Sequence, residues 1–198
     1  MRQLSFFSVE ARPPRVADLA GLMCGPGQAV RFGLGGAARL SVVVAGKWRA
    51  DALVTECAER GVGAEVAVSD EGNPLVRTAF RADLAELAAG WTRGAVKAVP
   101  AGLELDGAIL RLWALAAGRS DGRSYQLGLD PRAPDTYEPL AAALARAGVT
   151  PVLLGPRGGG PALRIIGRRR LGRLAELVGA PAPGTPPLAW PLDADASS

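Results

Sequence analysis

The chain has 198 residues, 48% of them hydrophobic and 21% charged, which suits one sizeable domain or two small ones. It contains no histidine, which excludes histidine-based catalytic triads, histidine–zinc sites and histidine proton shuttles. Cys24 and Cys57 form no CxxC pair, so two reduced, buried thiols are expected. No secretory signal and no apolar stretch of about 18 residues is recognised, so a cytoplasmic protein without membrane contact is expected.

The charge is unevenly distributed. The formal net charge is +4, from 23 basic and 19 acidic residues, and only Lys47 and Lys97 among the basic residues are lysines. Residues 139–175 hold seven arginines and no acidic residue, so the other 16 basic and 19 acidic residues sum to −3. The chain therefore has one strongly basic region and a mildly acidic remainder, and the basic region is compatible with a polyanionic partner.

The first half shows helix and strand patterns in the order α-β-β-α-β-β-α, after a short arm over residues 1–15. The predicted helices are Val16–Cys24, Lys47–Arg60 and Arg81–Ala89, and the predicted strands are Gln28–Leu34, Arg39–Ala45, Ala64–Ser69 and Leu75–Phe80. Gly35-Gly36 favours a hairpin between the first two strands, and Gly61 and Gly90 end helices.

The second half repeats this order after a linker over residues 91–103. The predicted helices are Glu104–Ala117, Asp135–Ala147 and Arg168–Val178, and the predicted strands are Ser124–Leu129, Thr150–Leu154 and Ala162–Ile166. Asp135 is expected to cap its helix. Residues 181–198 are rich in proline and end in polar residues, so a disordered tail is predicted.

Sequence matches between the halves indicate an internal duplication. Leu84-Ala85-Glu86-Leu87 recurs as Leu174-Ala175-Glu176-Leu177, and Leu75-Val76-Arg77 corresponds to Ala162-Leu163-Arg164. Leu19, Leu22 and Gly25 correspond to Leu112, Leu115 and Gly118 in the same order. The sequence therefore predicts an α+β fold of two similar subdomains, residues 16–90 and 104–180, with antiparallel sheets and pseudo-twofold symmetry.

The run Leu19-Ala20-Gly21-Leu22-Met23-Cys24-Gly25-Pro26-Gly27 resembles the signature of the LAGLIDADG homing endonucleases. The resemblance implies that the helices starting at Val16 and Glu104 pack along the pseudo-twofold axis. It also implies that the two sheets lie along the major groove of double-stranded DNA. The residues expected at the helix interface are Leu19, Gly21, Leu22, Leu112, Leu115 and Gly118.

In that family, the acidic residue before the last glycine of each signature holds a catalytic divalent metal. The matching positions here are Pro26 and Arg119, and a hard cation needs carboxylate oxygens. Asp121, two residues further on, is expected to be a turn residue in Ser120-Asp121-Gly122. We therefore expect no catalytic residue, metal or cofactor, and a residual metal-dependent endonuclease stays the second alternative.

The second half is also similar to the WhiA family of bacterial sporulation regulators, a non-cleaving branch of the LAGLIDADG group. The similarity is clearest at Leu110–Ser120, Ser124–Leu129 and Arg168–Ala180. The whole resemblance extends over residues 4–180. That family continues into a helix-turn-helix domain, for which this sequence shows no counterpart. The resemblance implies a role in transcription regulation, sporulation or cell division.

The basic residues lead to the functional hypothesis. Arg168-Arg169-Arg170 opens a predicted helix, where the helix dipole disfavours cations, so a use in phosphate contact is indicated. The full set of expected DNA-binding residues is Arg157, Arg164, Arg168, Arg169, Arg170, Arg173, Arg31, Arg39 and Arg77. We expect a non-catalytic, monomeric, DNA-binding regulatory protein in the cytoplasm, where it could associate with the nucleoid. A protein-interaction module that binds a regulator or cell-division partner is the first alternative, because Glu65, Asp70 and Glu71 make the first half less basic.

Overall fold

The structure is a computed structural model that describes residues 7–157 and 159–191. In its first half a four-stranded antiparallel sheet, of order β1-β2-β4-β3, packs against helices. The elements are α1 (Ala20–Cys24), β1 (Gln28–Phe32), β2 (Ala37–Val43), α2 (Lys47–Glu59), β3 (Ala64–Val68), β4 (Pro74–Thr78) and α3 (Ala85–Gly90). Short 3-10 turns at Val16–Leu19 and Ala82–Leu84 lead into α1 and α3.

The second half builds a sheet of the equivalent order, β7-β8-β10-β9, which is also antiparallel throughout. Its elements are α4 (Gly107–Ala117), β7 (Gly118–Ser120), β8 (Ser124–Gly128), α5 (Tyr137–Arg146), β9 (Val152–Leu154), β10 (Ala162–Ile166) and α6 (Arg168–Val178). Each half therefore follows the order α-β-β-α-β-β-α. The predicted α+β fold with two duplicated antiparallel sheets is confirmed.

Local sequence explains why each sheet has one buried and one open face. In β2, Ala38, Leu40 and Val42 are buried against the helices, while the alternating residues Arg39 and Ser41 remain partly exposed. This is the period of two that a strand imposes on its side chains. Each sheet therefore packs its apolar residues onto the helix layer and presents the other set outward.

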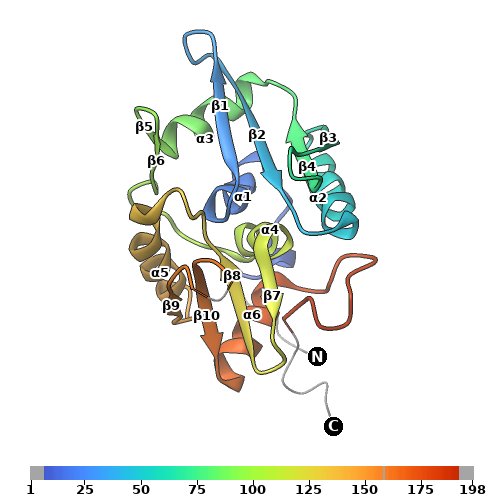
Figure 1. Cartoon of the computed structure of the whole chain (residues 1–198), viewed down its shortest axis with the longest axis vertical. Helices are drawn as coiled ribbons and strands as arrows, with labels where there is room; N and C mark the ends of the chain where they lie inside the picture. Colours follow the sequence, from blue (N-terminus) through green and yellow to red (C-terminus); the bar gives the residue numbers. More distant parts are fainter. Residues whose placement is uncertain (1–6, 158, 192–198) are drawn as a thin grey trace.

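Helices α1 and α4 form the centre of the molecule, between the first sheet in the upper part and the second in the lower part (Figure 1). They approach closely at Gly21, where an added Cβ would lie 2.2 Å from the carbonyl oxygen of Ile109 and 2.8 Å from Cβ of Leu112. Leu19, Leu22 and Leu115 are buried in the same core. Only glycine permits this backbone contact, because any larger side chain would overlap α4.

Gly118 has a different environment from the one expected at the helix interface. An added Cβ there would lie 2.0 Å from the hydroxyl oxygen of Tyr125, in the sheet of its own half. Its carbonyl oxygen nevertheless accepts a hydrogen bond from Arg49 of α2, in the first half. Gly118 thus contacts the other half through its backbone rather than through helix packing.

Three differences from the predicted elements concern the end of the first half and the start of the second. The helix expected from Glu104 begins at Gly107, because Oδ1 of Asp106 caps it by accepting a hydrogen bond from the backbone N–H of Ile109 at 3.0 Å. The sequence prediction had no strand at β7, which follows α4 without a connecting loop. The segment treated as a linker contains a small hairpin, β5 (Thr92–Arg93) with β6 (Val96–Lys97). The exact subdomain limits, 16–90 and 104–180, stay predictions.

The prediction of a disordered tail is wrong for residues 181–191. Trp190 is 3% exposed, its indole N–H donates to the carbonyl oxygen of Gly179 at 2.8 Å, and the guanidinium of Arg111 lies 5.4 Å from its ring centroid. A buried aromatic with a satisfied N–H anchors this proline-rich segment to the helix layer. Residues 192–198 lie outside the described residues. Among the helices that the structure describes, none is long and apolar enough to cross a membrane.

Candidate nucleic-acid interface

A row of polar residues crosses the outer face of the second sheet. The strand register places Arg119 of β7 opposite Gln126 of β8, and Gln126 opposite Arg164 of β10. Their neighbours along β8, Tyr125 and Leu127, are buried on the helix side, so the three side chains project outward. We call Arg119, Gln126 and Arg164 the polar row.

The polar row is held in place by its own hydrogen bonds. Nε and Nη2 of Arg119 donate to Oε1 of Gln126 at 3.0 and 2.8 Å, and Nη1 donates to the carbonyl oxygen of Gly159 at 3.2 Å. Nε of Arg164 donates to Oγ of Ser124 at 2.8 Å. Since Arg119 is exposed and Arg164 is partly exposed, these contacts orient the guanidinium groups without burying them fully.

Asp121 anchors one end of this arrangement. Its Oδ2 lies 3.2 Å from Nη2 of Arg164, and its two oxygens accept hydrogen bonds from the hydroxyl of Ser124 and from the backbone N–H groups of Arg123 and Ser124. These hydrogen bonds lower the pKa of Asp121 to about 2, and the bond from the Ser124 hydroxyl has the largest effect. Asp121 is therefore a charged turn residue that positions Arg164, and both its oxygens are already engaged.

The outer face of the first sheet carries Arg39 and Arg77 beside exposed apolar side chains. Nε of Arg77 pairs with Oε1 of Glu65 at 2.6 Å on the neighbouring strand, and the guanidinium of Arg39 lies 4.8 Å from the ring centroid of Phe80. The exposed apolar side chains on or beside this face are Val30, Phe32, Val43 and Phe80. The two arginines predicted here thus have an acidic and an aromatic partner.

Arg31 lies on the other side of that sheet. The register places it opposite Ala38, which is buried on the helix side, whereas Val30 lies opposite Arg39. Arg31 and Arg39, both expected to bind DNA, therefore project from opposite faces of the sheet, because adjacent residues such as Val30 and Arg31 point to opposite faces.

The arginines after β10 extend the basic surface at the end of the second sheet. Arg168, Arg169 and Arg170 are exposed in the first turn of α6 and line a shallow hollow of about 760 Å³. Arg157 is exposed in the loop between β9 and β10. These four arginines lie in the β9–β10 loop and at the start of α6, beside the sheet rather than on its face.

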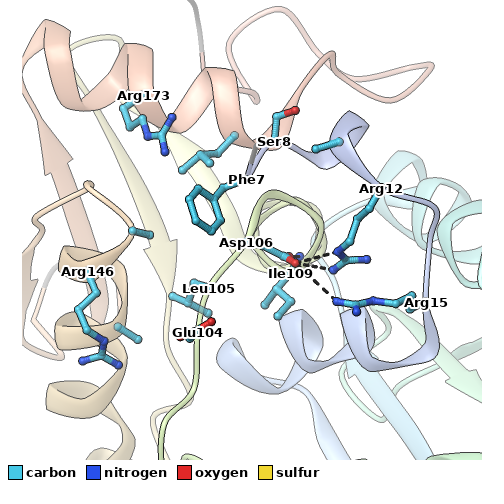
Figure 2. A pocket seen from close by; sticks show the side chains of 14 residues that line it. Phe7, Ser8, Arg12, Arg15, Glu104, Leu105, Asp106, Ile109, Arg146 and Arg173 are labelled. Carbon is cyan, nitrogen blue, oxygen red and sulfur yellow. Dashed lines mark hydrogen bonds and ion pairs between the residues drawn. The ribbon is translucent and has the colours of Figure 1, made fainter. Parts of the chain in front are cut away.

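Arg173 belongs to the helix layer. It pairs with Oε2 of Glu176 at 3.0 Å and lines a hollow of about 500 Å³ together with Leu105, Arg12 and Arg146. Figure 2 shows Arg173 and Arg146 on one side of this hollow, and Arg12 directed at Asp106 on the other. The structure therefore separates Arg173 from the polar row.

No family model matches the sequence, and no curated protein matches it. The fold matches the DNA-bound homing endonuclease I-WcaI with a TM-score of 0.60 at 12% identity, over 82% of this chain and 79% of that one. It matches the N-terminal LAGLIDADG domain of WhiA with a TM-score of 0.53 at 12% identity, over 83% and 82% of the two chains.

Full-length WhiA from Thermatoga maritima matches with a TM-score of 0.56 at 13% identity, over 83% of this chain and 55% of that one. The chain has the LAGLIDADG fold. It spans about half the length of full-length WhiA and most of the length of the other two matches. At these identities the likeness concerns the fold, so the chemistry must be judged from the residues of this chain.

The residues at the junction of the two halves do not fit the divalent metal that the LAGLIDADG fold implies. Pro26 and Arg119 stand at the signature positions and line one hollow of about 300 Å³, with Gly128 and Gly159. Proline offers no side-chain oxygen and a guanidinium repels a cation. Within residues 7–157 and 159–191, no group of three or more Cys, Asp and Glu side chains is placed to hold a metal ion.

Sequence reasoning missed two features of this region. It treated Arg119 only as a lost acid, although the same residue begins the polar row. It gave no role to Lys97, whose ammonium donates to the backbone carbonyl oxygens of Gly25 and Gly27. The outward position of Arg119 could have been found by assigning alternate residues after Ala117 to opposite faces of a strand. The role of Lys97 depends on a contact across 70 residues of sequence, which no local pattern encodes.

Proposed function

We propose that this protein binds double-stranded DNA without cleaving it and acts in transcription regulation. The observation that carries the proposal is the polar row on an open sheet face, in a fold shared with a DNA-bound endonuclease. Arginine and glutamine are the side chains that hydrogen-bond guanine and adenine edges in the major groove. A row of them on a solvent-facing sheet suits contact with a duplex.

The surrounding arginines supply the sequence-independent part of binding in this proposal. Arg157 and Arg168–Arg170 would contact phosphates on either side of the row, because they lie exposed at the turns that border the second sheet. Arg39 and Arg77 contribute less, since Phe80 and Glu65 already engage them. The second half is therefore the main DNA-contacting half, in a chain that works as a monomer.

The proposed lack of cleavage rests on Pro26 and Arg119. Neither residue can hold the hard cation that metal-dependent strand cleavage requires, and Asp121 is engaged by three donors of its own turn. A plasmid-nicking assay with Mg²⁺ or Mn²⁺ is expected to show no product. Nicking by the wild-type protein that disappears in Asp121→Asn would instead establish the residual endonuclease.

Salt-dependent DNA binding tests the main proposal. Titration of a fluorescently labelled duplex, followed by anisotropy between 50 and 300 mM KCl, is expected to show affinity that falls steeply with salt. A logarithmic slope of about −3 to −4 corresponds to phosphate contacts by the four arginines Arg157 and Arg168–Arg170. Absence of binding at 50 mM KCl, or binding indifferent to salt, would contradict it.

A protein partner on the first sheet is the second candidate function. The exposed apolar side chains Phe32 and Phe80, with ring centroids 5.4 Å apart, favour it. Such a partner would fit a regulatory role in sporulation or cell division. Purified candidate regulators should lose binding to Phe32→Ser but keep it in Arg164→Ala, and the opposite pattern would reject this surface.

A further inference from the structure

The junction between the halves contains a buried lysine that the proposed function does not use. Lys97 lies on β6, in the hairpin that connects the two halves, and its side chain is 7% exposed. Its ammonium nitrogen lies 2.6 Å from the carbonyl oxygen of Gly25 and 2.8 Å from that of Gly27. It lies 3.3 Å from Oδ2 of Asp130, which belongs to the second half.

These contacts use all three N–H groups of the ammonium. The single carboxylate of Asp130, 3% exposed, balances its charge and also accepts a hydrogen bond from the amide of Gln28 at 2.5 Å. The same amide donates to the carbonyl oxygen of Pro26 at 3.3 Å. The cluster thus joins the end of α1 to the second half, with a cation at its centre.

The oxygen atoms around Lys97 are of the kind that bind hard cations. Two backbone carbonyls and one carboxylate surround the ammonium, and backbone and carboxylate oxygens are the usual ligands of calcium and magnesium. Gly25 and Gly27 flank Pro26, which stands where the first signature has its metal-binding acid. The positive charge at this point therefore comes from the chain itself.

We propose that Lys97 is the resident cation of the junction and excludes a divalent metal from it. Its ammonium fills the oxygen cluster beside Pro26, and its fixed charge repels a second cation. Restoring carboxylates at Pro26 and Arg119 is then insufficient to create a metal site while Lys97 is present. This inference concerns metal binding alone and stands whether or not the protein binds DNA.

The test compares Mn²⁺ binding by three proteins in the absence of DNA, using isothermal titration calorimetry. They are the wild type, Pro26→Asp/Arg119→Asp, and the same double variant with Lys97→Ala. We expect saturable Mn²⁺ binding by the triple variant, and none by the wild type or the double variant. A double variant that binds Mn²⁺ as tightly as the triple variant would overturn the proposal.

Folding of the variants is followed by circular dichroism and thermal unfolding. A triple variant that folds without binding Mn²⁺ also overturns the proposal, because removal of the ammonium should open the oxygen cluster. If Lys97→Ala prevents folding in that background, Lys97→Gln replaces it, since the amide can still donate to one carbonyl. As the matched control, Lys47→Ala in the double variant removes an exposed lysine and must leave Mn²⁺ binding unchanged.

Discussion

The two sheets of this protein share one strand order but present different outer faces. The second sheet carries Arg119, Gln126 and Arg164 across three neighbouring strands, linked to one another or to their turns by hydrogen bonds. On the outer face of the first sheet, Arg77 is paired with Glu65 on the neighbouring strand, and apolar side chains such as Phe32 stay exposed. The fold therefore fixes the platform, and the outward residues of each strand determine what that platform can contact.

The packing of α1 against α4, on which both sheets rest, gives the largest expected effect. Gly21→Ala places a methyl group 2.2 Å from the carbonyl oxygen of Ile109, so α1 and α4 must move apart. We expect the free energy of unfolding to fall by about 3 kcal/mol or more, measured by urea denaturation.

Gly36→Ala is the matched control, because nothing lies within 4 Å of the Cβ it adds and its φ is not positive. It should change the free energy of unfolding by less than about 0.5 kcal/mol. Equal effects of the two substitutions would show that α1–α4 packing does not support both halves.

Arg49 connects the halves at a second point. From α2 it donates to the carbonyl oxygens of Ala114 and Leu115 at 2.9 and 2.7 Å and to that of Gly118, at the end of α4. Arg49→Met removes these donors from buried carbonyls just before β7. We expect a loss of about 2–3 kcal/mol in the free energy of unfolding, and displacement of Arg119.

Arg93→Met provides the comparison for Arg49, since Arg93 is exposed and its hydrogen bonds stay within its own turn. Its effect on urea denaturation should be within about 0.5 kcal/mol. A similarly small effect of Arg49→Met would mean that solvent replaces its hydrogen bonds.

Two equal charge changes sharpen the comparison between the outer faces. Asp121→Asn releases Arg164 from its carboxylate partner, and Glu65→Gln releases Arg77. Both remove one negative charge, so a general electrostatic effect would be the same. We expect the affinity for a duplex in 50 mM KCl to rise about threefold for Asp121→Asn and less for Glu65→Gln. Equal increases would place both faces equally close to the DNA.

The smallest predicted effect concerns pH. Because the folded-state pKa of Asp121 is about 2, below its ordinary value of 3.8, the carboxylate stabilises the fold above pH 3.8 and loses that contribution as the pH falls towards 2. Nuclear magnetic resonance titration of the Asp121 carboxyl carbon should show this pKa. Ser124→Ala, which removes the principal donor, should raise the pKa; no change would assign the shift to the backbone N–H groups of Arg123 and Ser124 and to Arg164.

Most of the architecture could be predicted from the sequence, because its period-two and helical patterns are local. β10 and α6 have the predicted limits, Ala162–Ile166 and Arg168–Val178. The strand β7 was missed because Gly118 resembles a helix-ending glycine, although it continues directly into a sheet. The packing of Trp190 depends on a contact with Arg111, far away in the sequence, so composition alone indicated disorder.

The candidate site could be predicted only in part. Arg164 was found from the basic region and lies on the outer face, whereas Arg173 from the same region lies in the helix layer. Charge counts do not distinguish these positions, because burial and strand register decide which way a side chain projects. The junction around Lys97 needs three segments brought together and had no sequence signal.

The most direct test of the central claim compares two double variants in one DNA titration. Arg119→Ala/Arg164→Ala removes both arginines of the polar row, and Arg39→Ala/Arg77→Ala removes two from the other outer face. If the second half carries the interface, fluorescence anisotropy should show an affinity loss of about tenfold or more for the first variant. The second variant should lose less than about threefold. Equal losses, or a larger loss for Arg39→Ala/Arg77→Ala, would contradict the account.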